Sequence, residues 1–168
     1  MNLKCLRATG FCVGLAIPLL PQTPAAPLPA QILTAKKVFV AYAGNDAQDY
    51  LTGDQDRPYR DFYAALKAWG RYDLVGAPSD ADLLFEIRLT IHPAQFFGGG
   101  GLSANDVQLR LAIRDPKTRT PLWTLTEHVR SGSRKAERNV YFGQALAKLV
   151  SDVQLLTAQP AAPAGASK

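Results

Sequence analysis

Two histidines and four arginines are the side chains of this sequence best suited to bind a charged group. His92 and His128 lie where apolar and polar residues alternate, and both take polar positions. The same alternation gives polar positions to four arginines: Arg88, Arg110, Arg114 and Arg130. Because alternate residues of a strand share one face of a sheet, we expect a basic face that binds carboxylate or phosphate groups. The alternative is an ordinary solvated face on which Glu86 and Glu127 balance the charge.

The histidines do not predict a metal or catalytic centre. A zinc site needs three or more protein ligands close together, and Glu86 is too far along its strand from His92 to share one. No serine lies in a Gly-x-Ser-x-Gly context. We expect two surface histidines, no cofactor and no enzyme activity, with a weak metal site and a hydrolase whose triad forms only in space as alternatives.

Two aromatic residues, Phe96 and Phe97, precede a run of four glycines, 98–101. The run has no Lys-Ser/Thr after it and leads into a strand pattern, so it predicts a flexible hairpin connection and not a phosphate loop. Large apolar side chains on such a tip predict contact with a partner or a membrane surface. The alternative is that one of them folds back under the loop.

A polar loop carries four aspartates: Asp46, Asp49, Asp54 and Asp56. No glutamate follows at the spacing of a calcium loop. We expect these carboxylates to favour the N-terminal end of the helix that follows.

The elements that position these residues follow from hydrophobic periodicity. Apolar residues recur every three or four positions over 58–69, with a stop at Gly70, and again over about 140–156, which predicts two helices. Five segments predict strands: 36–42, 71–75, 83–92, 107–114 and 123–130. Segment 36–42 is apolar at consecutive positions, which is typical of a central strand covered on both sides. The order β-α-β-β-β-β-α predicts an α+β fold, a two-layer sandwich of a mostly antiparallel five-stranded sheet with two helices on one face.

The first thirty residues predict a cleavable signal peptide. Lys4 and Arg7 precede an apolar run over 8–20, and the segment closes at Ala30. The run is shorter than the ~20 residues that span a bilayer. Cys5 and Cys12 are the only cysteines, and Cys12 has no lipobox before it. We therefore expect an exported mature chain without thiols, lipid anchor or transmembrane segment.

Composition defines one domain. The chain has 168 residues and a net charge of +5, which falls to +3 without the predicted signal peptide. This charge is too small for a dedicated nucleic-acid binder. Residues 157–168 are rich in alanine and proline and predict a disordered tail, which leaves a single domain over 31–156.

The run Gly70-Arg71-Tyr72-Asp73-Leu74-Val75, followed by Ala81-Asp82-Leu83-Leu84-Phe85-Glu86-Ile87, resembles small α/β domains of the bacterial envelope. These are the TolB N-terminal domain, LpoB, CsgG and uncharacterised exported families of similar layout. The resemblance covers about residues 36–130 and lies in the fold, not in a site. It implies an interaction or assembly module of the cell envelope.

We therefore expect a non-catalytic module, periplasmic or secreted, that binds an envelope protein or a cell-wall component. The expected contacts are the four arginines and the Phe96-Phe97 loop. A carrier for a small anionic glycan or lipid is the second hypothesis, and a hydrolase is the third.

Overall fold

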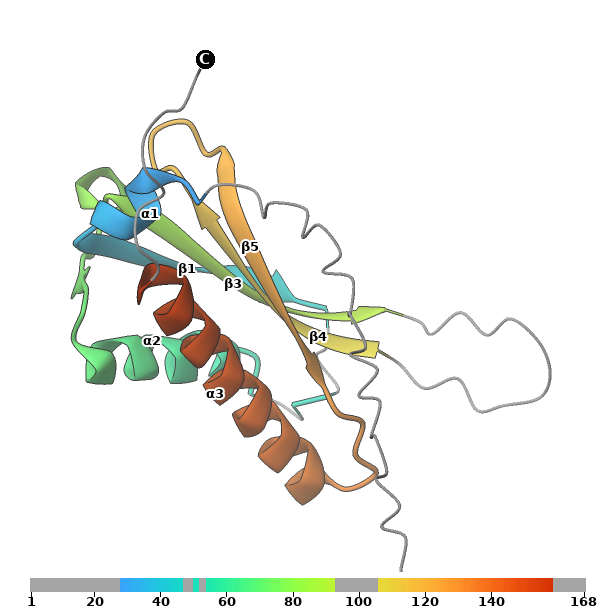
Figure 1. The fold of residues 1–168 in the computed structure, drawn as a ribbon. Helices are drawn as coiled ribbons and strands as arrows, with labels where there is room; N and C mark the ends of the chain where they lie inside the picture. The colour runs from blue at the N-terminus through green and yellow to red at the C-terminus, as the bar shows by residue number, and fades with distance from the viewer. Residues whose placement is uncertain (1–27, 47–49, 52–53, 93–105, 159–168) are drawn as a thin grey trace, which may run out of the picture.

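A five-stranded sheet forms the centre of the protein (Figure 1). The structure, a computed structural model, describes residues 28–46, 50, 51, 54–92 and 106–158. The strands are β1 (Lys37–Asn45), β2 (Asp73–Leu74), β3 (Leu83–His92), β4 (Asp106–Arg114) and β5 (Pro121–Val129). Their order across the sheet is β2-β1-β3-β4-β5. β1 is parallel to β2 and β3, whereas β3, β4 and β5 form an antiparallel meander. The predicted α+β fold with a mostly antiparallel sheet is confirmed.

The two long helices lie together on one face of this sheet, which makes the fold a two-layer sandwich (Figure 1). The helices are α1 (Ala30–Thr34), α2 (Arg57–Trp69) and α3 (Lys135–Ala158), with a 3₁₀ turn, η1, at Pro78–Asp80. α3 is longer than predicted at both ends, and Thr157, expected to begin the tail, is buried in its last turn. Within the described residues, no helix has the length and hydropathy needed to cross a membrane.

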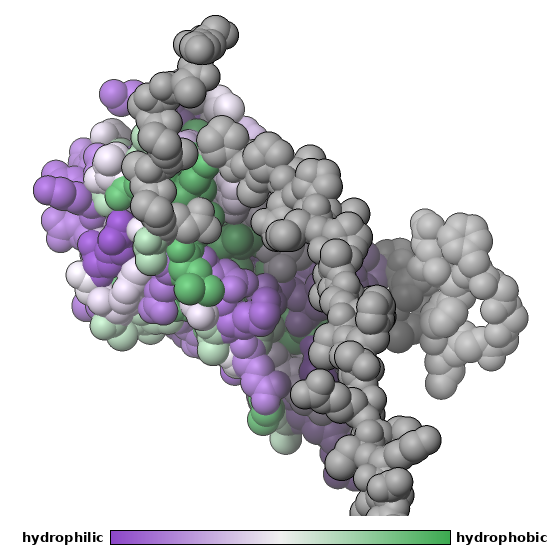
Figure 2. Space-filling model, in the orientation of Figure 1, coloured by the Kyte–Doolittle hydropathy of each residue, from purple (hydrophilic) through white to green (hydrophobic). Residues whose placement is uncertain are grey.

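The core lies between the helices and the sheet. Its largest fully buried side chains include Phe62 of α2, Phe85 of β3 and Phe142 of α3. The rings of Phe62 and Phe85 are 6.3 Å apart and tilted by 37°. Hydrophobic side chains also gather where α1 meets the C-terminal end of α3 (Figure 2). Each buried aromatic ring removes roughly 150–250 Å² from water, so these contacts fix the helix layer on the sheet.

β1 was predicted to be covered on both sides, and this prediction is wrong. Val38 and Val40 are buried under the helices, but Phe39 and Ala41 point to the opposite face and are only half-buried. The strand does lie inside the sheet, between β2 and β3. Its continuous apolar run therefore belongs to an interior strand that has one face under the helices and the other face half-buried.

Local capping explains where the elements begin and end. Gly70 ends α2 with φ 71°, a left-handed conformation that costs glycine little, and its amide donates to the Leu66 carbonyl at 3.2 Å. Asp82 fixes the start of β1, because its Oδ2 accepts the backbone amides of Lys36 and Lys37, each at 2.9 Å.

The N-terminal region enters the fold at α1. Ile32 is fully buried, and the side-chain amide of Gln31 donates through Nε2 to the backbone carbonyl of Asp82 at 2.9 Å. Leu28 packs against the core, and Ala30, the last residue of the predicted signal peptide, begins α1. Residues 1–27 lie outside the described residues, so the signal peptide stays a prediction.

Candidate binding face of the sheet

The face of the sheet turned away from α2 and α3 carries most of the sequence-predicted polar residues. We call it the open face and define it by the side chains that alternate with the core residues along each strand. Its members are Phe39, Ala41 and Ala43 of β1, Leu84, Glu86, Arg88, Thr90 and His92 of β3, Asp106, Gln108, Arg110, Ala112 and Arg114 of β4, and Thr124, Thr126 and His128 of β5.

Two arginines lie directly opposite one another at the centre of the open face. Arg88 of β3 is the cross-strand partner of Arg110 of β4. Arg88 is neutralised by Asp46, whose Oδ2 lies 2.6 Å from Nη2 of the guanidinium. Arg110 is exposed and has no hydrogen-bond or ion-pair partner in the part of the chain that the structure describes. Like charges at directly opposite positions destabilise a sheet, so the unpaired guanidinium of Arg110 is a local electrostatic cost.

Arg114 is held in place by an ion pair. Its Nε lies 2.5 Å from Oε2 of Glu86, and its Nη1 donates to the Arg119 carbonyl at 3.0 Å. Both side chains line a depression of about 230 Å³ on the open face. The other residues that line it are Ala43, Arg88, Thr90, Arg110, Ala112, Pro121 and Thr124.

The depression therefore offers one free guanidinium beside two paired ones. Arginine binds carboxylate and phosphate bidentately, and the exposed hydroxyl of Thr124 adds a neutral donor. Such a surface suits a single anionic group presented by a partner.

The two histidines lie at the far end of the open face. Nδ1 of His128 is 2.8 Å from Oδ1 of Asp106, and Nε2 of His92 is 3.4 Å from the Thr90 hydroxyl. The hydrogen bonds from His128 and Gln108 hold the pKa of Asp106 below its usual value. Among the described residues, no group of three histidine, cysteine or acidic side chains is placed to hold a metal ion.

Arg130 does not join the other arginines, so its predicted position is wrong. β5 ends at Val129, and the chain then turns toward α3. The Arg130 guanidinium lies 4.7 Å from the centre of the Tyr141 ring of α3, on the helix side of the sheet. Alternation places a residue only while the strand continues, and Arg130 is one residue beyond its end.

Glu127 does not balance the charge of the open face either. It pairs across the strands with Leu109, a core residue, and therefore faces the helices. Its Oε1 accepts a hydrogen bond from Lys148 of α3 at 2.6 Å. The carboxylates that do serve the open face are Glu86, Asp46 and Asp106.

The acidic loop is divided between two roles. Asp54 forms two hydrogen bonds with the Arg60 guanidinium, at 3.0 and 2.7 Å, and so acts at the first turn of α2 as predicted for this loop. Asp46 instead reaches Arg88, because β1 runs parallel to β3 and its end lies beside that strand. Asp56 precedes α2 without a side-chain capping bond. Asp49, Phe96, Phe97 and the four glycines 98–101 lie outside the described residues.

No protein-family model matches the chain, and no curated protein matches it. Solved structures do match. A PelC dodecamer from Paraburkholderia phytofirmans is 19% identical over 79% of this chain and 94% of its own, with a TM-score of 0.49. The DUF330 protein XCC0632 from Xanthomonas campestris is 16% identical over 82% of this chain and 90% of its own, also at 0.49. Uncharacterized lipoprotein B from Nitrosomonas europaea is 12% identical over 82% and 89%, at 0.36.

Identities and TM-scores of this size assign neither a family nor a function to the chain. The finer resemblance to the TolB N-terminal domain, LpoB and CsgG stays a prediction from the sequence.

Proposed function

We propose that this chain is an exported, non-catalytic module of the cell envelope that binds a protein or cell-wall partner through the open face. The observation that carries the proposal is Arg110, which is exposed, lies directly opposite Arg88 and has no ion-pair partner among the described residues. An arginine that lies opposite a like charge, with no counter-ion of its own among the described residues, is expected where an external anion supplies one. Phe96 and Phe97 remain proposed as the apolar part of the same contact.

The side chains around Arg110 support binding in preference to catalysis. Arg88, Arg114 and His128 are each tied to a carboxylate of this chain. In the described ranges, no serine hydroxyl is hydrogen-bonded to His128, whose partner is Asp106. A general base needs a nucleophile within hydrogen-bond reach, and this arrangement supplies an ion-pair network in its place.

The proposal is tested by reversing the charge at Arg110. Wild-type protein and Arg110→Glu, each with a C-terminal tag, are incubated with periplasmic extract and, separately, with purified cell-wall sacculi. We expect a partner that the wild type retains and Arg110→Glu loses, with retention weakening as salt is added because exposed charges are screened. The two arms separate a protein partner from the wall itself.

Lys67→Glu is the matched control, because it makes the same charge change on the exposed side of α2 in the helix layer. It is expected to retain the partner. Equal retention by wild type and Arg110→Glu would refute the role of the open face. If Arg110→Glu still retains the partner but Phe97→Ser loses it, the contact is made by the Phe96-Phe97 segment and not by the open face.

Export is tested separately, on the native protein. Mass spectrometry of the mature chain is expected to find an N-terminus near Gln31, without Cys5 and Cys12. A cytosolic chain that keeps both cysteines would refute the proposed compartment and, with it, the class of partner.

A further inference from the structure

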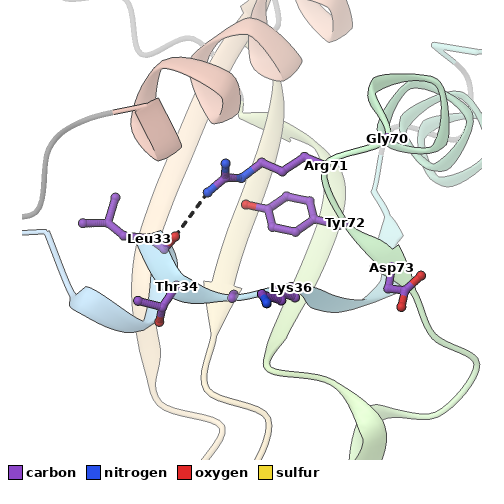
Figure 3. A pocket seen from close by; sticks show the side chains of 8 residues that line it. Leu33, Thr34, Lys36, Gly70, Arg71, Tyr72 and Asp73 are labelled. Atoms are coloured by element: carbon purple, nitrogen blue, oxygen red, sulfur yellow. Dashed lines mark hydrogen bonds between the residues drawn. The ribbon is translucent and has the colours of Figure 1, made fainter.

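A second polar pocket lies at the opposite edge of the sheet, where α1 leads into β1 and α2 leads into β2 (Figure 3). Its volume is about 480 Å³. The residues that line it are Leu33, Thr34, Ala35, Lys36, Gly70, Arg71, Tyr72 and Asp73. It shares no residue with the open face, so whatever it binds is independent of the proposed function.

Tyr72 lines this pocket, and its hydroxyl is buried behind the pocket surface. The residue is only 6% exposed, and its ring packs edge-on against Trp69 and Phe85 at 5.4 and 5.7 Å. Its hydroxyl is buried and has no hydrogen-bond partner within 3.5 Å among the described residues, although the Arg71 guanidinium and the Thr157 hydroxyl lie near enough to lower its pKa. Burying a hydroxyl without a partner costs free energy, and native structures keep few such groups. A tyrosine that served only the core would be replaced by phenylalanine without this cost.

Two cations line the same pocket. The Arg71 guanidinium lies 5.6 Å from the centre of the Tyr72 ring and uses one N–H, from Nη2, to bond the Leu33 carbonyl at 3.2 Å. In the described parts of the chain the Lys36 ammonium makes no hydrogen bond or ion pair, and its charge contributes to the lowered pKa of Asp82. Figure 3 shows the Asp73 carboxylate turned away from Arg71 and Tyr72. The pocket therefore holds a local excess of positive charge and of unused donors.

Burial raises the pKa of Tyr72, and the Arg71 guanidinium offsets part of that rise. The hydroxyl consequently stays protonated at neutral pH and can only gain by donating to an acceptor. Arg71 and Lys36 likewise donate and do not accept.

We propose that this pocket binds the phosphate group of a small phosphate monoester, with Arg71, Lys36 and the Tyr72 hydroxyl as its donors. A phosphate monoester carries close to two negative charges at neutral pH, which match the two cations, and three oxygens, which match the three donors. The pocket is larger than a phosphate group, and Leu33 and Ala35 provide an apolar wall for the rest of the molecule.

Trp69 gives a direct readout of binding, because the Arg71 guanidinium lies 5.9 Å from its ring centre. The chain has two tryptophans, so Trp123→Phe leaves Trp69 as the only reporter. In this background, inorganic phosphate and glycerol phosphate are titrated at about pH 8, where the second phosphate proton is lost. We expect a saturable change of fluorescence that sodium chloride at the same ionic strength does not produce. Acetate, with one charge, is expected to bind at least about tenfold more weakly.

The variants assign the donors. Tyr72→Phe removes a hydroxyl that has no hydrogen-bond partner within 3.5 Å among the described residues, so it is expected to keep the fold and to weaken phosphate binding by about three- to tenfold. Arg71→Gln is expected to weaken it by at least about tenfold, since its hydrogen bonds are charge-assisted. Arg134→Gln, an exposed arginine at the start of α3, is the control and should bind as the parent does.

Three results would overturn the proposal: no saturable change with either phosphate, equal affinity for acetate and phosphate, or unchanged affinity in Tyr72→Phe. None of them bears on retention of a partner by the open face, which depends on Arg110. The two proposals therefore fail separately.

Discussion

Replacing Arg110 by glutamate is expected to make the folded protein more stable. Arg88 and Arg110 are direct cross-strand partners, and the Cβ atoms of such pairs are about 5 Å apart. Like charges at this position cost a few tenths to about 1 kcal/mol. Asp46 already neutralises part of the Arg88 charge. The side chains of Arg88 and Asp46 are about half exposed, so water further screens the repulsion between Arg88 and Arg110.

The substitution removes this repulsion and adds an attraction to Arg88. We expect the free energy of unfolding to rise by about 0.5–1 kcal/mol in low salt, which raises Tm by roughly 2–5 °C for a domain of this size. Arg110→Gln removes only the repulsion and is expected to give about half of that gain.

Urea denaturation in about 20 mM and about 500 mM salt tests this reasoning, because the higher concentration shortens the Debye length to a few ångströms. The gain should nearly vanish in high salt. Lys67→Glu puts a negative charge in the last turn of α2, where the helix dipole favours a positive one, and should not become more stable.

A loss of stability in Arg110→Glu, or a gain that salt does not reduce, would mean that the arginine is not held in an unfavourable pair. The expected combination of higher stability and lost partner would exclude misfolding as the cause of that loss.

Three further substitutions test the fold. Phe62→Ala empties a fully buried site against Phe85 and should cost about 3–5 kcal/mol in thermal or urea denaturation; a cost below about 1 kcal/mol would contradict its place in the core. Gly70→Ala must adopt the left-handed conformation and should cost about 1 kcal/mol, whereas Gly76→Ala, at a negative-φ site with open space around it, should cost much less; equal losses would contradict the cap. Asp82→Ala should lose about 1 kcal/mol at pH 7, because its carboxylate binds two backbone amides at the start of β1. Those amides lower the folded-state pKa of Asp82 below its unfolded value, so its contribution is complete above about pH 4 and is lost as the pH falls through the folded pKa. Denaturation from pH 7 to 3 should therefore show a smaller acid loss in the variant, and parallel curves would contradict the assignment.

Much of the open face could be predicted from sequence because strand alternation is local. A period of two over 83–92 and 107–114 is enough to place Arg88, Arg110 and Arg114 on one side. Alternation also puts Glu127 beside the core residues, so the sequence itself contains the signal for its place on the helix side of the sheet. Arg130 was misplaced because no local pattern marks Val129 as the last residue of the strand.

Register and parallel pairing could not be predicted in the same way. Arg88 faces Arg110, and not a residue two positions away, because of packing across the whole sheet. Asp46 reaches Arg88 only because β1 pairs with β3 through a crossover of about forty residues, which no short-range pattern records. The unsatisfied hydroxyl of Tyr72 is likewise invisible in sequence, since it depends on α1, β2 and α2 meeting at one edge.

The pair formed by Glu127 and Lys148 has a consequence for how the protein meets other chains. Among the described residues, β5 has no second neighbour, so one side of a nine-residue strand leaves its amides and carbonyls free. An edge strand with unpaired backbone groups can pair with a strand of another molecule, which leads to aggregation. Any strand that docked there would bring a side chain next to a carboxylate that is 12% exposed and already bound to an ammonium group. An apolar strand that paired there would remove water from both charges, which disfavours the pairing of hydrophobic strands along β5. The arginines of the open face are not involved in this protection and stay accessible.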